Sequence, residues 1–338
     1  MKVVFSPDHR LQNPRSEIHL GTPIPTFERA TRAENIRSEL MKDPRFVFVD
    51  PFEHGRHPIE RVHVAGMVDF LERAWTDMHD ETGRDEFVPE VMLHSGLREN
   101  MPSVSPPRSA SSAFGYWCYE TATPVVSGTY RAARASVDVA LTAGDIVLAG
   151  ERSAYALCRP PGHHAARAVF GGFCYFNNAA IVADHLVRAT GSKVAILDVD
   201  YHHGNGTQLI FYERDDVFFT SLHGDPTRAY PWFTGFRDET GAGRGKNSTY
   251  NVPLPAETSD ETYLQRLADA CSKITHFGPD ILVVSLGVDT YWNDPISDFA
   301  LTTEGYAKCA ELVRNTGLPV VVVQEGGYDI EAIGVNVR

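Results

Sequence analysis

The feature that most constrains the fold is a series of short runs in which almost every residue is apolar. These runs lie at 3–5, 46–49, 154–158, 194–197, 217–220, 281–285 and 320–323. Strands that are apolar on both faces are typical of a parallel sheet buried between two layers of helices. Amphipathic stretches separate some of them, at 178–189, 260–277 and 303–315. The alternation predicts an α/β fold with helices on both faces of the sheet.

Two segments depart from this alternation. Residues 86–128 are rich in Pro, Ser and Gly, have weak periodicity and contain the aromatic cluster Phe114, Tyr116, Trp117 and Tyr119. Such long loops are uncommon unless they bind something, and the aromatic residues argue against disorder. We therefore expect a structured excursion from the sheet, and we expect a second excursion over 223–250.

Charge and composition limit the classes of partner. The chain has 338 residues and a formal net charge of −13, which disfavours nucleic acid and suits a cationic partner, although it also suits solubility alone. No apolar run approaches the roughly 20 residues of a membrane span, and no signal peptide is evident. The five cysteines are scattered without a CxxC pair, so we expect reduced thiols and a cytoplasmic protein.

Potential metal ligands follow two of the apolar runs. Asp200 and His202 come just after 194–197 and precede glycines; two residues apart in extended chain, they point to the same face. Asp289 follows 281–285. Each alone also fits a polar turn or a helix cap, but ligands bind outside the carboxyl ends of parallel strands. Three protein ligands leave a position open, so the pattern predicts a catalytic site for Zn²⁺, with Fe²⁺ or Co²⁺ as alternatives.

Other runs also lead into reactive side chains. His163 and His164 follow 154–158 and suit proton transfer, further metal binding or a plain polar turn. Tyr328 follows 320–323 and suits either an oxyanion donor or a structural anchor. The glycine pair and aromatic residues of 170–176 fit a narrow apolar channel or core packing. Together they predict metal-assisted hydrolysis of an amide or ester.

The motifs RPPGHHA, FGGFCYFNNAA, ILDVDYHHGNGTQ, SLHGDP, SLGVDT and EGGYD resemble the histone-deacetylase-like family of the arginase/deacetylase fold. Within it they are most similar to the bacterial acetylpolyamine amidohydrolase branch. The resemblance covers nearly the whole chain. It implies a zinc-dependent deacetylase with a single domain, 1–338, built around an eight-stranded parallel sheet.

The resemblance also implies roles for individual residues. The metal ligands would be Asp200, His202 and Asp289. The catalytic residues would be His163, His164 and Tyr328, with Asp198 and Asn205 orienting the two histidines. The substrate contacts would be Gly172, through its carbonyl, and Phe173 and Tyr230, which would flank a tunnel for the acyl group, together with Glu325 at the rim of the site. A structural K⁺ would be held by Asp198, Asp200, His202, Ser221 and Leu222, and a second monovalent cation would lie near Phe211, Arg214 and Val217.

One catalytic position differs from many relatives, which have Asp where this chain has Asn205. An amide stabilises a neighbouring imidazolium less than a carboxylate does. We therefore expect His164 to be the more readily neutral histidine of the pair, and so the general base.

In the polyamine branch, the segment matching 86–128 forms a homodimer contact and narrows the partner's active-site entrance, which selects thin cationic substrates. Relatives carry two acidic residues in this loop; by ungapped count this chain has Ser111 and Ala122 there. The resemblance implies an enzyme that removes acetyl or short acyl groups from amines, most of all acetylpolyamines. The alternatives are a deacetylase of acetyl-lysine or another small acylated amine, and a non-catalytic acyl-amide binder. An arginase-type ureohydrolase is disfavoured because SLGVDT supplies one aspartate rather than a pair.

Overall fold

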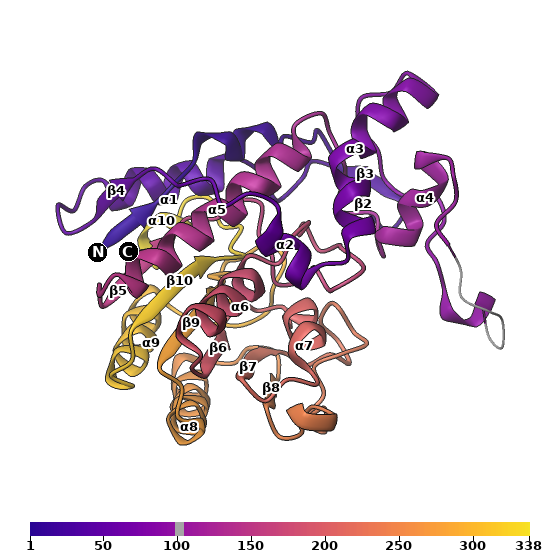
Figure 1. Cartoon of the computed structure of the whole chain (residues 1–338). Coiled ribbons are helices and arrows are strands. Elements are labelled where there is room, and N and C mark those ends of the chain that lie inside the picture. The colour runs from indigo at the N-terminus through magenta and orange to yellow at the C-terminus, as the bar shows by residue number, and fades with distance from the viewer. Residues whose placement is uncertain (99–104) are drawn as a thin grey trace.

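The computed structural model describes residues 1–98 and 105–338 and contains an eight-stranded sheet in which all neighbouring strands are parallel (Figure 1). In spatial order its strands are β4 (Val47–Val49), β1 (Lys2–Val4), β5 (Ser153–Ala156), β10 (Val320–Gln324), β9 (Ile281–Leu286), β6 (Val194–Asp198), β7 (Val217–Gly224) and β8 (Thr249–Leu254). The predicted α/β fold with an eight-stranded parallel sheet is confirmed. A small antiparallel hairpin joins β2 (Glu17–His19) to β3 (Thr22–Ile24).

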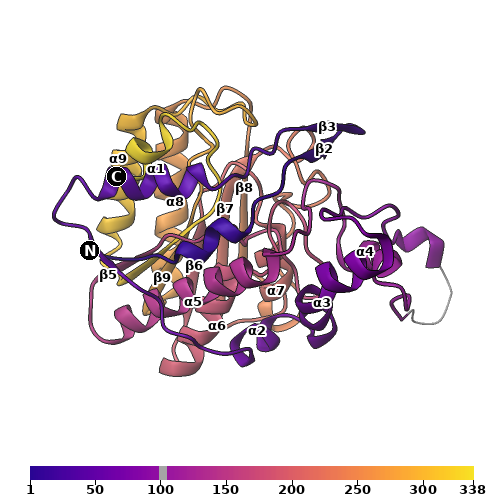
Figure 2. The ribbon, with the colours of Figure 1, turned by 90° about the horizontal axis from the view of Figure 1, so that it is seen from above.

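Helices cover both faces of the sheet. They are α1 (Thr31–Leu40), α2 (His57–Val62), α3 (Ala65–Thr82), α4 (Ala110–Trp117), α5 (Thr129–Leu148), α6 (Asn178–Thr190), α7 (Asn205–Phe211), α8 (Asp260–Phe277), α9 (Thr303–Asn315) and α10 (Ile333–Val337). In Figures 1 and 2, α2, α5 and α6 lie on one side of the sheet, while α8 and α9 lie on the other. The predicted helices over 178–189, 260–277 and 303–315 correspond to α6, α8 and α9.

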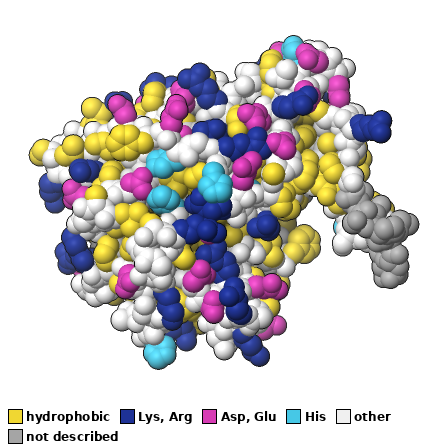
Figure 3. All heavy atoms as spheres, viewed as in Figure 1, with side chains coloured by type: hydrophobic (Ala, Val, Ile, Leu, Met, Phe, Trp, Pro, Cys, Tyr) yellow, Lys and Arg dark blue, Asp and Glu magenta, His cyan; other side chains and the backbone are white. Residues whose placement is uncertain are grey.

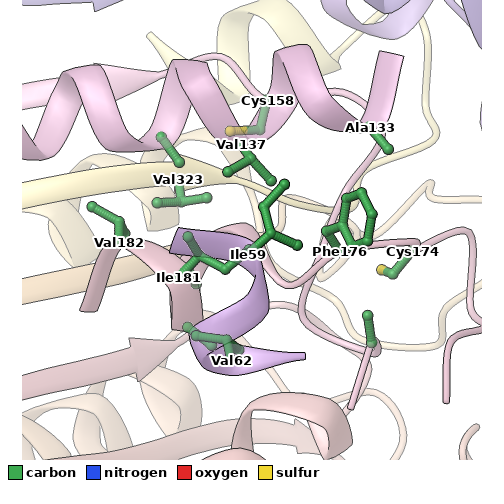
Figure 4. Close-up of a cluster of buried hydrophobic side chains, with 14 of the residues drawn as sticks. Ile59, Val62, Ala133, Val137, Cys158, Cys174, Phe176, Ile181, Val182 and Val323 are labelled. Carbon is green, nitrogen blue, oxygen red and sulfur yellow. The ribbon is translucent and has the colours of Figure 1, made fainter. Parts of the chain in front are cut away.

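Side chains of the central strands alternate between two hydrophobic cores. On β9, Val283 belongs to the core under α5 and α6, whereas Leu282 and Val284 belong to the core under α8. Figure 4 shows the core under α5 and α6, in which Val137 of α5 and Val182 of α6 pack against the sheet. Both faces of the central strands are therefore buried, which explains why their runs are apolar at every position.

The excursion predicted over 223–250 is confirmed over 225–248, which contains no strand, but its two end residues on each side belong to strands. Strand β7 continues to Gly224, and the eighth strand, β8, begins at Thr249. The β8 sequence includes Asn251 and Pro253 and lacks a continuous apolar run. It pairs with β7 alone, at the edge of the sheet, where a proline that cannot donate to the ladder is tolerated.

The described part of 86–128 is structured, as predicted, and projects from one side of the molecule (Figure 2). Helix α4 buries Phe114 and Trp117 against the main core. Its N-cap, Ser109, accepts a hydrogen bond from Ser112 N. Residues 99–104 of this segment lie outside the described residues.

The surface over α2 and α6 carries basic side chains next to acidic ones (Figure 3). Arg61, Arg188 and Arg214 all form ion pairs with the buried carboxylate of Asp184. The buried Asp184 carboxylate therefore fixes the positions of all three guanidinium groups. In the part of the chain that the structure describes, none of the helices is long and apolar enough to cross a bilayer.

Candidate active site and metal centre

The three predicted metal ligands meet at the carboxyl ends of β6 and β9. Ligand atoms of Asp200, His202 and Asp289 all lie within 4.8 Å of one another. His202 Nδ1 lies 3.0 Å from Asp289 Oδ2 and 3.3 Å from Asp200 Oδ1. Both aspartates are 0% exposed, and burial together with the Asp200 carboxylate raises the pKa of Asp289 to about 7. Two buried carboxylates so close together need a cation between them, and this donor set suits Zn²⁺.

Glycines make room for these carboxylates. A Cβ atom on Gly326 would lie 2.4 Å from Asp289 Oδ2 and 2.5 Å from Asp200 Oδ2, and one on Gly287 would lie 2.1 Å from Asp200 Oδ2. Backbone amides fix the same groups: Gly326 N donates to Asp200 Oδ2 over 2.8 Å, and Tyr201 N donates to Asp289 Oδ1 over 2.8 Å. The loops are thus shaped around the ligands as well as supplying them.

The two predicted catalytic histidines lie side by side, with ring centroids 4.0 Å apart. His163 Nδ1 lies 3.0 Å from Asp198 Oδ2, and its Nε2 lies 3.8 Å from Asp200 Oδ1. His164 Nδ1 lies 2.7 Å from Asn205 Oδ1. Each histidine therefore has its Nδ1 occupied by an oxygen and its Nε2 available to the site.

The two histidines differ in their affinity for protons. Burial would lower the pKa of His163, but the Asp200 and Asp198 carboxylates outweigh it and raise that pKa to about 10. Burial and the positive charge on His163 hold the pKa of His164 well below its ordinary value. The asymmetry supports the expectation that His164 is the neutral member of the pair.

Tyr328 is buried at the carboxyl end of β10, on a loop held by two residues that the sequence did not single out. Arg32 of α1 donates to the carbonyl oxygens of Gly327, over 2.5 Å, and Glu325, over 2.6 Å, and its guanidinium lies 4.5 Å from the Tyr328 ring centroid. Asp294 accepts a hydrogen bond from Tyr328 N over 2.7 Å. No sequence signal marks either residue, because the groups they bind on the Tyr328 loop are backbone groups or an aromatic face.

The two aromatic residues predicted to flank the acyl tunnel lie beside the predicted catalytic residues. The Tyr230 ring lies 5.0 Å from that of His164, and the Phe173 ring lies 5.8 Å from that of Tyr328. A Cβ atom on Gly172 would lie 2.4 Å from the His164 ring, so only glycine allows the backbone to approach so closely.

Glu325 is not at the rim of the site, where we expected it. It is 0% exposed, and its carboxylate accepts hydrogen bonds from Gly162 N over 2.6 Å and His163 N over 3.2 Å. Burial raises the pKa of Glu325 to about 7. Glu325 therefore holds the backbone of the loop that carries His163, because the buried amides of Gly162 and His163 need an acceptor there.

The other expected positions are distributed as follows. At the predicted K⁺ site, Asp198 pairs in register with Ser221 on β7, next to Leu222. At the second predicted cation site, Arg214 N donates to the carbonyl oxygen of Phe211 at the turn before Val217. Both monovalent-cation sites stay predictions. Ser111 is exposed on α4, where its amide donates to Glu81, and the amide of Ala122 donates to Glu120.

A candidate metal triad beside two histidines and a buried tyrosine, at the carboxyl ends of a parallel sheet, is an arrangement typical of metal-dependent hydrolases. Residues 26–338 match the histone deacetylase domain, and the chain belongs to that family of deacetylases.

Relatives match this chain over nearly its full length and theirs. The chain is 43% identical to acetylpolyamine amidohydrolase 1 of Pseudomonas aeruginosa, over 99% of this chain and 96% of that protein. It is also 43% identical to acetylpolyamine amidohydrolase of Mycoplana ramosa, over 100% and 97%. The crystal structure of acetylpolyamine aminohydrolase from Burkholderia pseudomallei superposes with a TM-score of 0.94 at 40% identity, covering 100% of this chain and 96% of that one.

Gly326→Ala should abolish zinc binding without unfolding the protein. The added methyl group would collide with the carboxylates of both Asp200 and Asp289, so the ligands would have to separate. Equilibrium dialysis against buffered zinc measures the affinity, and far-UV circular dichroism checks the fold. Wild-type zinc affinity in the variant would contradict this assignment of the metal site.

Proposed function

We propose that this protein hydrolyses the amide bond of acetylated, or similarly short-acylated, small cationic amines, with acetylpolyamines as its main substrates and Zn²⁺ as its metal. The observation that carries the proposal is the buried Asp200–His202–Asp289 triad. Beside it lie His164, whose pKa is lowered, and His163, whose pKa is raised. Full-length relatives named acetylpolyamine amidohydrolases support the substrate class. The net charge of −13 is compatible with attraction of cationic amines.

When bound by Asp200, His202 and Asp289, Zn²⁺ would polarise the amide carbonyl and lower the pKa of water; Fe²⁺ or Co²⁺ fits the same ligands. His164 is the general base, because Asn205 occupies its Nδ1 and its low pKa leaves Nε2 free to accept a proton from water. His163, paired with Asp198, holds the proton that the leaving amine needs.

The remaining groups orient the substrate. Tyr328 donates a hydrogen bond to the carbonyl oxygen as negative charge develops there. The carbonyl oxygen of Gly172 accepts a hydrogen bond from the amide N–H of the substrate, while Phe173 and Tyr230 flank the acyl group.

A substrate panel with the zinc-loaded protein tests the proposal. We expect acetylputrescine, acetylcadaverine and acetylspermidine to be hydrolysed with higher kcat/KM than an acetyl-lysine peptide, because the substrate class follows the relatives. Acetate release measures the reaction. A preference for the peptide would favour the acetyl-lysine alternative, and binding without acetate release would favour the non-catalytic binder.

In the same assay, Tyr328→Phe should lower kcat by roughly 10²–10³-fold through the loss of one oxyanion donor. Tyr250→Phe is the matched control, because Tyr250 lies on the edge strand β8 and should leave kcat unchanged. Zinc content is compared in both variants. Near-normal turnover in Tyr328→Phe would rule out this role for the tyrosine.

Asn205→Asp should move the acid limb of the kcat/KM pH profile to higher pH. A carboxylate in place of the amide stabilises the imidazolium of His164, and a nearby opposite charge raises a pKa by about one unit or more. The base is then lost to protonation at a higher pH than in the wild-type enzyme. An unchanged acid limb, at equal zinc content, would show that His164 does not act as the base.

We further propose a cytoplasmic homodimer in which the segment 86–128 contacts the partner subunit and each subunit holds a structural K⁺. Val91, Leu93 and Leu97 of this segment have exposed apolar side chains, a pattern typical of interaction sites. Leu97→Glu should shift the sedimentation coefficient of the intact protein from that of a dimer to that of a monomer. A wild-type protein that sediments as a monomer at micromolar concentration would contradict the proposal.

A further inference from the structure

A tight turn with unfavourable backbone geometry lies at the tunnel wall. Gly171 and Cys174 exchange two backbone hydrogen bonds, of 3.1 and 3.2 Å. Between them, Gly172 has φ of 61° and Phe173 has φ of 65°. Positive φ at both central positions is typical of a type I′ turn. Glycine adopts it freely, but a bulky residue such as phenylalanine does so only when its surroundings hold it there.

Two side chains from the long segment 86–128 satisfy the outward amides of this turn. Gly172 N donates to Glu120 Oε1 over 2.9 Å, and Phe173 N donates to Thr123 Oγ1 over 2.7 Å. The Thr123 hydroxyl in turn donates to Glu120 Oε1, whose other carboxylate oxygen accepts from Ala122 N. Thr123 is 0% exposed, so water cannot readily replace it. A chain of hydrogen bonds, here called the relay, thus runs from the Phe173 amide through the Thr123 hydroxyl to the Glu120 carboxylate.

The same short segment, residues 119–123, also contacts Tyr230 on the opposite side of the predicted tunnel. The Tyr119 hydroxyl accepts a hydrogen bond from that of Tyr230 over 2.8 Å. The Tyr119 ring packs directly on Gly171, where a Cβ atom would lie 2.6 Å from it. Residues 119–123 therefore contact both aromatic walls, and the separation of Phe173 from Tyr230 depends on them.

We propose that Glu120 and Thr123 are positioning residues that hold Phe173 in its left-handed conformation and thereby set the size of acyl group that the enzyme accepts. The proposal rests on the deacylase function proposed above. Without the relay, Phe173 relaxes towards negative φ, its ring leaves the tunnel wall, and the neighbouring Gly172 carbonyl turns away. The site then widens, and the advantage of a small acyl group over a larger one is reduced.

The test compares acyl groups on one amine. Thr123→Val keeps the shape of the side chain but removes both the acceptor for Phe173 N and the donor to Glu120. With zinc-loaded protein, the ratio of kcat/KM for acetyl-putrescine to that for butyryl-putrescine should fall by roughly tenfold, about the discrimination that one or two methylenes give in a shaped pocket. KM and kcat are reported separately, and Thr123→Ser should restore the wild-type ratio.

Thr121→Val is the matched control. It makes the same substitution two residues away, at a threonine that donates to the carbonyl oxygen of Ile18 rather than to the turn, and it should leave the ratio unchanged. If Thr123→Val does not fold, Glu120→Gln makes the same comparison. Glutamine has a single acceptor oxygen, so it cannot accept both from Ala122 N and from the Gly172 amide and Thr123 hydroxyl at the other end. A wild-type ratio in the folded relay variant would overturn the inference.

A second readout does not depend on activity. Thr123→Val should lower the melting temperature relative to the wild-type protein. The same substitution should lower it much less when it is added to Phe173→Gly, because glycine needs no restraint at positive φ. An equal loss in both backgrounds would also overturn the inference. If the wild-type enzyme releases no acyl group at all, the proposed function fails, while this thermal comparison still reports on the relay.

Discussion

The burial of two carboxylates, Asp200 and Asp289, at the carboxyl ends of β6 and β9 is the constraint on which the rest of the site depends. Burying one ionised carboxylate without a partner is costly, and burying two a few ångströms apart is worse. The chain offsets this cost with backbone amides, one imidazole and space for a cation. Gly287 and Gly326 are necessary for the same reason, because any side chain at either position would occupy the space of the carboxylates.

The charge at this centre also organises the layer around it. Acidic groups near His163 favour its protonated form, whereas His164 faces the neutral amide of Asn205 and the positive charge of its neighbour. Two adjacent histidines of identical chemistry thereby acquire opposite proton affinities, as acid and base catalysis requires. Glu325 lies below both and fixes the backbone that carries them, so a carboxylate can be essential to the arrangement without facing the substrate.

The sequence predicted what depends on a side chain's own chemistry and missed what depends on its partner's backbone. Central strands such as β6 and β9 were evident because both of their faces are buried, and the metal ligands were evident because they follow those strands. Strand β8 was missed because an edge strand needs no continuous apolar run. Arg32 and Asp294 were missed because they bind carbonyl and amide groups of the Tyr328 loop, and every residue supplies such groups, so no motif marks the pair.

The long segment 86–128 combines two physical environments, and this division explains how a loop outside the sheet can influence chemistry within it. Its outer part exposes Val91 and Leu97, which have no effect on the site unless another surface covers them. Its inner part, from Tyr119 to Thr123, is hydrogen-bonded to the tunnel turn. The isolated hydrogen bonds of such a turn are weak in water but strong when shielded. Substitutions in the outer part therefore act through association between subunits, whereas substitutions in the inner part act on the acyl group through the turn that carries Phe173.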